Sequence, residues 1–331
     1  MRGREGKTLA YWEDERFILN HAPESTWLQF RDGVAARFYR LLMNFVHPKD
    51  VQRPNKVSIC AIFKDEAPYL REWIEFHRIV GVEHFYLYNN QSDDDFRSIL
   101  APYVEKGIVT LIEWPYPQAQ MEAYWDCVAR FRMETRWIGF IDLDEFVVPR
   151  KANNIYEILQ PFEKNRPVVM FYWRVFGSSG RLDRSRNGLV TEDFVCCWPK
   201  HDDLGKVFYN TAYDPMPEFH KNVSMHHTQW AKYSGIAFPP VNMDGNVCVG
   251  TRHMVDSLDF PVQINHYFTK SYREYCVTKQ KRGDVMYSKN PHDEQYFFLH
   301  DEKCTAVDYS AYRFLIRLKK AMQEHERGAV R

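Results

Sequence analysis

The chain has 331 residues, of which 45% are hydrophobic and 27% are charged, a composition typical of a globular protein. Its 44 basic residues equal its 44 acidic residues, and the zero formal net charge argues against nucleic-acid binding through a broad basic surface. Seven cysteines without Cys-x-x-Cys spacing argue against a zinc cluster and predict reduced, mostly buried thiols.

The first predicted element is one amphipathic helix over residues 27–46, where apolar residues recur at near-helical spacing with arginines nearby. Two interpretations stay open for it. It packs on the rest of the chain, which is the more common outcome, or it lies on the inner face of a membrane. No apolar run is long enough to span a membrane and no apolar signal core opens the chain, so we expect a soluble, cytoplasmic protein.

Short apolar segments then alternate with helical patterns, beginning after the turn residues around Pro48 and Pro54. The predicted strands are 56–63, 84–89, 108–114 and 137–141, and the helices between them begin near Pro68, Asp95 and Gln118. This alternation predicts an α/β fold with a doubly wound, mostly parallel sheet. In such sheets ligands bind beyond the carboxyl ends of the strands, where the polar clusters 64–66, 89–95 and 142–145 lie.

The pattern becomes mixed after Pro149. Strands are predicted at 168–175 and 191–198, and helices at 271–281 and 309–325. Residues 199–262 show little periodicity, which is typical of substrate-binding loops. We therefore expect a helical extension (1–54), a domain with two halves (55–150 and 151–290), and a helical tail packed on that domain (291–331).

The apolar segment 137–141 leads into Asp142-Leu143-Asp144. Because side chains alternate along a strand, we expect both aspartates to point the same way. Two partly buried carboxylates repel each other unless a cation or a proton lies between them. A divalent ion that prefers oxygen ligands would relieve the repulsion and leave positions for a third protein ligand, water and phosphates. The pattern favours metal-assisted transfer from a phosphorylated donor, although Asp-x-Asp also occurs on solvated loops.

Several further motifs accompany the Asp-x-Asp segment along the chain. They are Phe63-Lys64-Asp65-Glu66 before a helix with Trp73, Glu75 and His77; residues 88–94; Gln120, Asp126 and Cys127; Trp173 with residues 176–180; and residues 266–271. With the Asp-x-Asp segment, they resemble glycosyltransferase family 92 (DUF23) and related bacterial family-2-like glycosyltransferases over about residues 56–283. The resemblance implies a GT-A fold, a nucleotide-sugar donor, a Mn²⁺ or Mg²⁺ ion and an inverting transfer.

The resemblance implies that Asp144 binds the ion directly, while Asp142 contacts the ribose or binds through water. Glu145 points to the other face, and we expect it to have a structural role. His266 is the preferred third ligand because imidazole suits Mn²⁺. The alternative for His266 is a hydrogen-bonded core histidine, with the His226-His227 pair as the competing ligands.

Lys270 and Arg273 lie three residues apart, so a helix would place them on one face, where they would hold the diphosphate of the sugar donor. A solvated basic face that also includes Lys279 is the equal alternative. Strand-end geometry favours Asp65, Asn89 and Ser92 as ligands of the base and ribose, although these residue types also form turns without a ligand. The resemblance adds Gln120 to the donor-binding residues.

An inverting transfer needs a carboxylate that accepts the proton of the acceptor hydroxyl. Glu192 is our choice because it lies on a predicted strand after the loop at residues 177–180. Asp183, Asp193 and Asp214 are also eligible, and a structural salt bridge is the other interpretation of Glu192.

Together these features predict a metal-dependent hexosyltransferase of polysaccharide biosynthesis that moves a sugar from a UDP-sugar to a glycan or other hydroxyl acceptor. One alternative is a metal-dependent phosphohydrolase or nucleotidyltransferase. Clustered metal ligands or an early Gly-rich phosphate loop would favour it, and neither is evident. The other alternative is a sugar- or nucleotide-binding protein without activity.

Overall fold

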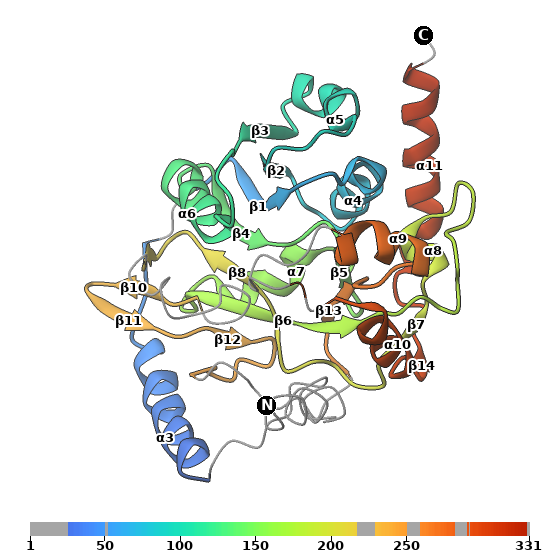
Figure 1. Cartoon of the computed structure of the whole chain (residues 1–331). Helices are drawn as coiled ribbons and strands as arrows, with labels where there is room; N and C mark the ends of the chain where they lie inside the picture. The colour runs from blue at the N-terminus through green and yellow to red at the C-terminus, as the bar shows by residue number, and fades with distance from the viewer. Residues whose placement is uncertain are drawn as a thin grey trace.

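The computed structural model describes residues 26–49, 52–216, 229–249, 259–281, 290 and 292–329. The centre of this part is a nine-stranded sheet (Figure 1). Four of its strands run parallel in the order β3-β2-β1-β4. They are β1 (Asn55–Phe63), β2 (His84–Asn89), β3 (Val109–Glu113) and β4 (Thr135–Phe140). The predicted doubly wound, parallel first half is confirmed.

Three helices connect these strands, as the sequence predicts. They are α4 (Ala67–Ile79), α5 (Phe96–Glu105) and α6 (Gln120–Phe131). Pro68 suits the first turn of α4, and Leu70, Trp73 and Ile74 are fully buried against the sheet. Helix spacing therefore places one apolar side of α4 in the core.

The second half of the sheet is mixed. β8 (Gly205–Asn210) lies antiparallel between β4 and β6 (Val168–Val175), and β13 (Val262–His266) runs parallel to β6 and antiparallel to β5 (Glu145–Pro149). The short β12 (Val241–Asn242) also pairs with β6. The remaining short elements are α7 (Ile155–Leu159), η1 (Gln160–Phe162), β9 (Asp214–Pro215), β10 (Ala231–Tyr233) and β11 (Ile236–Phe238).

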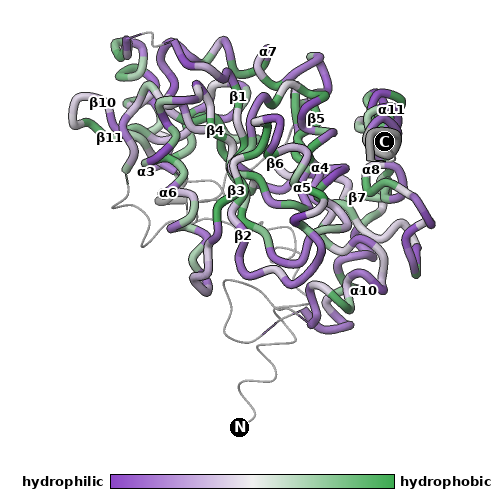
Figure 2. The backbone as a smooth tube through the Cα atoms, turned by 90° about the horizontal axis from the view of Figure 1, so that it is seen from above, coloured by the Kyte–Doolittle hydropathy of each residue, from purple (hydrophilic) through white to green (hydrophobic). Residues whose placement is uncertain are grey.

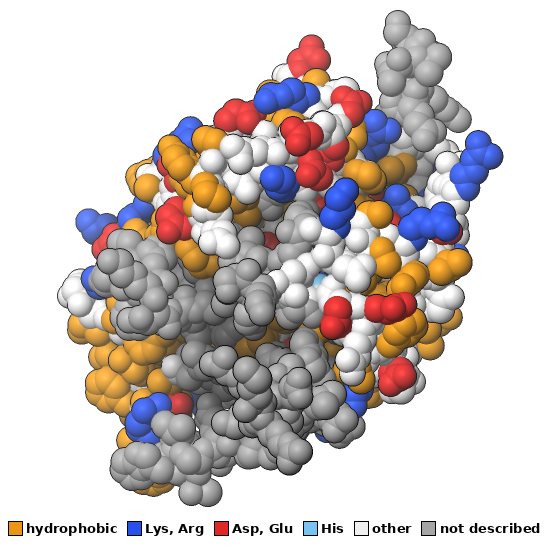
Figure 3. All heavy atoms as spheres, viewed as in Figure 1, with side chains coloured by type: hydrophobic (Ala, Val, Ile, Leu, Met, Phe, Trp, Pro, Cys, Tyr) orange, Lys and Arg blue, Asp and Glu red, His pale blue; other side chains and the backbone are white. Residues whose placement is uncertain are grey.

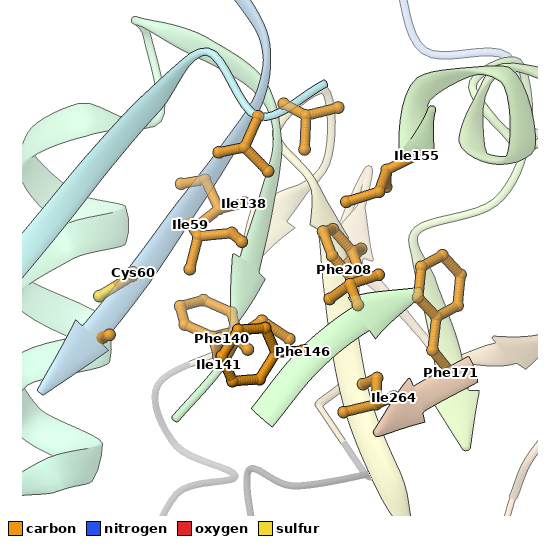
Figure 4. Packing of buried hydrophobic residues seen from close by; sticks show 14 of the residues in the cluster. Ile59, Cys60, Ile138, Phe140, Ile141, Phe146, Ile155, Phe171, Phe208 and Ile264 are labelled. Carbon is orange, nitrogen blue, oxygen red and sulfur yellow. The ribbon is translucent and has the colours of Figure 1, made fainter. Parts of the chain in front are cut away.

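β8 corrects the expectation that residues 199–262 are irregular. Val207, Phe208 and Tyr209 are all fully buried, so this central strand has no alternation of apolar and polar residues. A side chain at Gly205 would place its Cβ atom 1.9 Å from the carbonyl oxygen of Phe171, so only glycine allows this close approach. Figure 4 shows Phe208 and Phe171 in the core, where their ring centroids are 4.8 Å apart.

The predicted strand 191–198 is wrong. The structure has the short helix α8 (Val190–Asp193) and the two-residue β7 (Cys196–Cys197), which pairs with β14 (Ala306–Val307). The buried carboxylate of Glu72 accepts hydrogen bonds from the backbone N–H groups of Val190 and Thr191, at 2.7 and 2.9 Å. These N–H groups start the helical turn and have no partner within it, so a tertiary contact decides the local structure.

The C-terminal part contains α9 (Tyr272–Tyr275), a π-helical turn η3 (Cys276–Gln280), α10 (Glu294–Glu302) and α11 (Tyr312–Ala329). α11 packs against α4, where the ring centroids of Phe314 and Phe76 are 5.8 Å apart and Arg317 donates a hydrogen bond to the carbonyl of Ile79. Its far end extends beyond the sheet (Figure 1).

The predicted N-terminal helix is present as α3 (Thr26–Met43). Its Tyr39 packs edge-on against Trp230, and Met43 is fully buried. Hydrophobic segments otherwise concentrate around the central strands (Figure 2). Within the described ranges, no helix combines the length and apolar character needed to cross a membrane.

Candidate active site

The Asp-x-Asp motif lies in the turn between β4 and β5, where the N–H of Glu145 donates to the carbonyl of Asp142 at 3.1 Å. β4 ends at Phe140, so the expected strand alternation does not reach the two aspartates. Their side chains enter different contacts. Asp142 meets residues of α6 and β8, whereas Asp144 meets β13 and η3.

Asp142 is held by neighbouring side chains of the protein. The Nζ atom of Lys206 lies 2.7 Å from its Oδ2 atom, while Gln120 and Tyr124 each donate to its Oδ1 atom at 2.9 Å. Lys206 is only 1% exposed. Burial lowers the pKa of Lys206, but Asp142 and Glu145 more than offset this and hold the pKa above its ordinary value. A charged ammonium therefore neutralises the first aspartate.

Glu145 lies beneath the turn and is fully buried. Its Oε2 atom accepts a hydrogen bond from the N–H of Asp142 at 3.0 Å and lies 3.7 Å from the Nζ atom of Lys206. Its Oε1 atom has no hydrogen-bond partner among the described residues. Burial raises the pKa of Glu145 to about 7 although Lys206 opposes the shift. This geometry agrees with the structural role expected for Glu145.

Asp144 is surrounded by cationic and imidazole groups. Its Oδ2 atom lies 2.7 Å from the Nζ atom of Lys279 and 3.8 Å from the Nε2 atom of His266. Burial alone would raise the pKa of Asp144, but Lys279 and His266 hold it well below its ordinary range. Asp144 is therefore an ionised carboxylate at neutral pH.

Sheet register explains how His266 reaches the motif across more than a hundred residues of sequence. β13 pairs with β5 so that His266 is opposite Glu145, and the N–H of Tyr267 donates to the carbonyl of Asp144 at 2.8 Å. The His266 ring also lies against Trp173, with centroids 4.8 Å apart. The competing pair at positions 226 and 227 lies outside the described residues.

Asp144 and His266 supply one oxygen and one nitrogen donor that converge, a donor set that suits Mn²⁺. Within the described residues, no group of three or more His, Cys, Asp or Glu side chains is arranged to hold a metal ion. Asp142 fits direct coordination poorly because Lys206 neutralises it. The arrangement therefore supports Asp144 and His266 as the two protein ligands of an ion. Substrate and water would complete the coordination of that ion.

The expectation that Lys270 and Arg273 share one helix face is wrong. α9 begins only after Ser271, which forms a capping box with Glu274, and Lys270 precedes it with a left-handed φ of 52°. Lys270 is buried, with its Nζ atom 4.1 Å from the ring centroid of Tyr69, and burial lowers its pKa. Arg273 is exposed and pairs with Asp183 at 3.2 Å.

Asp65, Asn89 and Ser92 come together at the ends of β1 and β2. The N–H of Asp65 donates to the hydroxyl of Ser92 at 2.9 Å, and the N–H of Ser92 donates to Oδ1 of Asn89 at 3.0 Å. The neighbouring Asp94 accepts from the first N–H of α4, and Asp95 caps no backbone N–H of α5. The predicted cluster at this edge of the sheet therefore exists, stabilised by its own turn contacts.

Glu192 lies on α8 and contacts the C-terminal tail. Its Oε1 atom is 2.5 Å from the Nζ atom of Lys319, and its carbonyl accepts from the hydroxyl of Tyr312. These are the contacts of a structural ion pair, so the role of Glu192 as a base stays a prediction. Of the other eligible carboxylates, Asp193 bonds to Ser185 and Asp214 to Arg132.

Sequence reasoning missed two residues of the site, Lys206 and Lys279. The signal for Lys206 is a lysine inside the apolar segment of β8, where a solvated charge is not expected. Lys279 was interpreted as part of a solvated face. The π-helical turn aims it at Asp144, and no sequence spacing predicts such a turn.

Comparison of the sequence with known proteins identifies the family to which it is similar. The model of "Glycosyltransferase family 92" matches residues 53–295. A glycosyltransferase family 92 protein of Oryza sativa subsp. japonica is 28% identical over 166 residues, which are 47% of this chain and 28% of that protein. The beta-1,4-galactosyltransferase galt-1 of Caenorhabditis elegans is 31% identical over 119 residues, 31% of this chain and 28% of that protein.

The chain therefore spans less than a third of the length of these relatives. Among solved structures, TarS of S. aureus aligns over 47% of each chain with 13% identity and a TM-score of 0.33. The family match and the sheet topology agree with the GT-A-type α/β fold class expected from the sequence.

Proposed function

The chain belongs to glycosyltransferase family 92, and from this premise we propose that it transfers a hexosyl group from a UDP-sugar to a hydroxyl group of a glycan or other acceptor, with inversion. The observation that carries the proposal is the ionised Asp144, which lies beside His266 and Lys279 where β4 ends. Ligands of doubly wound sheets bind at this edge. The relatives named as beta-1,4-galactosyltransferases support galactose as the hexose.

The sugar donor would extend between two groups of residues. Asp65, Asn89 and Ser92 present carbonyl, carboxylate and hydroxyl groups for the base and ribose. Lys270 and Lys279 would contact the diphosphate, since both are cationic groups near Asp144, the first buried and the second partly buried. Lys206 holds the carboxylate of Asp142 in place, which suits a group that accepts hydrogen bonds from ribose hydroxyls.

Asp144 and His266 would hold a divalent ion. A bound Mn²⁺ or Mg²⁺ neutralises charge on the departing diphosphate. Lys279 must leave Oδ2 of Asp144 for an ion to bind there, and its ammonium is then available for the phosphates. Glu192 remains the proposed base for the acceptor hydroxyl, with the ion pair to Lys319 as the competing explanation of its position.

The test is incubation of the chain with a panel of nucleotide sugars, Mn²⁺ and glycan acceptors. Release of a nucleoside diphosphate that depends on the sugar donor would support the proposal. Release of a monophosphate or of pyrophosphate would favour the phosphohydrolase or nucleotidyltransferase, and binding without turnover would favour a binding protein. Asp144→Ala is the matched control, because background hydrolysis would persist in it.

A further inference from the structure

Helix α3 has two apolar faces, and only one of them packs on the domain. Tyr39 and Met43 lie on the packed face, where Tyr39 contacts the rings of Trp230 and Phe238. A second row of large apolar side chains is exposed to solvent. Four of its members are Val34 at 52%, Phe38 at 59%, Leu41 at 64% and Phe45 at 82%.

These four residues, called here the α3 stripe, form one continuous row. At about 100° per residue they fall within an arc of about 60°, and the N–H of Phe45 still bonds to the carbonyl of Leu42 in a helical turn. The packed residues Tyr39 and Met43 lie about 150° away from the centre of this arc. In Figure 3, hydrophobic side chains gather at the lower left of the molecule, in the region where Figure 1 draws α3.

Basic side chains border the stripe on both sides. Arg31 lies about 20° beyond Phe38, and Arg37 lies about 40° before Leu41 with Arg40 further along that side. All three are exposed. Arg31 pairs with Asp32 at 2.7 Å, whereas Arg37 and Arg40 form no ion pair within the part of the chain that the structure describes. Asp32, the one acidic residue of the helix, lies on the packed side.

This charge pattern distinguishes between two possible binding partners of the stripe, a second copy of the chain and a membrane surface. Two copies packed stripe to stripe would bring the arginines of both helices together, and the one acidic residue of α3, Asp32, already pairs with Arg31. A surface of anionic lipid headgroups complements the arginines, and their long aliphatic stems let the apolar side chains enter the acyl region beneath. We propose that the α3 stripe binds the surface of an anionic membrane, with α3 parallel to the membrane plane.

Sedimentation with lipid vesicles tests this proposal on the full chain. The vesicles are phosphatidylcholine alone, or phosphatidylcholine with about one third phosphatidylglycerol. We expect binding to the anionic vesicles that weakens as salt is raised. The variant Phe38→Ser/Leu41→Ser/Phe45→Ser should bind at least about tenfold more weakly, since three inserted side chains are lost.

The matched control carries Leu182→Ser, Val307→Ser and Ile316→Ser, which remove three apolar side chains of similar exposure elsewhere. It should bind like the unchanged chain. Arg37→Gln/Arg40→Gln should reduce the preference for anionic over neutral vesicles. Absence of vesicle binding by the unchanged chain, or equal binding by the stripe variant, overturns the proposal. A stripe variant that instead halves the molecular mass in solution would assign the stripe to self-association. None of these outcomes bears on the proposed transfer reaction.

Discussion

The ammonium of Lys206 lies 2.7 Å from the Oδ2 atom of Asp142. Lys206 lies on β8, and Asp142 lies in the turn that follows β4, the antiparallel neighbour of β8. Lys206 is thus the permanent counterion of the first aspartate of the Asp-x-Asp motif. Asp144 has a different counterion, Lys279, which comes from a short π-helical turn. The two aspartates of the motif are therefore held by different parts of the fold.

Lys206→Met should destabilise the protein by roughly 3–5 kcal/mol, because it leaves the buried carboxylate of Glu145 and the partly buried carboxylate of Asp142 without their cation. Urea unfolding measures the change. Lys151→Met is the control, since the same substitution there removes a surface ion pair with Asp259 and should cost about 0–1 kcal/mol. Similar losses for both variants would contradict the role given to Lys206.

Asp144→Ala should fold normally and lose at least about 100-fold in kcat, since the ligand of the proposed ion is removed. Excess EDTA should have a comparable effect on the unchanged enzyme. Turnover of a UDP-sugar with and without added Mn²⁺ provides the measurement. Full activity of the variant, or full activity in EDTA, would remove Asp144 and the ion from the mechanism.

Lys279→Met should tighten Mn²⁺ binding, because the ammonium that competes for Oδ2 of Asp144 is gone. His266→Ala should weaken it, because one of two converging donors is lost. Calorimetric titration with Mn²⁺ in the absence of substrate compares both variants with the unchanged chain. Unchanged affinity in both would mean that the ion binds elsewhere.

Glu145 should make stability depend on pH. Its pKa is about 7 in the folded state against an ordinary value of 4.5, so the folded state binds the extra proton and loses stability as pH rises between these values. The contribution is at most about 3 kcal/mol. Glu145→Gln mimics the protonated form, so its stability relative to the unchanged chain should rise between pH 4.5 and about pH 7. Parallel stability curves for the two proteins would show that Glu145 does not titrate in this window.

Glu192→Gln separates the two explanations of this residue. As half of a partly exposed ion pair with Lys319, it should cost about 0–1 kcal/mol of stability and leave kcat unchanged. As the base, it should lower kcat by about 100-fold or more. Lys319→Met breaks the same ion pair without touching the carboxylate, so equal kinetics in the two variants favour the structural explanation.

The sequence alone determined the parallel first half of the fold. Its strands are short apolar runs, its helices have one apolar side, and both patterns arise within a few neighbouring residues. The same local patterns placed Asp65, Asn89 and Asp142 at one edge of the sheet, because parallel strands end on the same side. The family resemblance then pointed to His266, a position that spacing in the sequence could not select from thirteen histidines.

Only the tertiary structure decided the charge partners within the site. β8 enters the sheet beside β4, and this pairing of distant segments places Lys206 against Asp142. Glu72 starts the helical turn that replaces a predicted strand and places Glu192 next to Lys319. Ion pairs and buried hydrogen bonds between residues 64 to 135 positions apart produce no periodic pattern along the chain, since each depends on where the sheet brings two segments together.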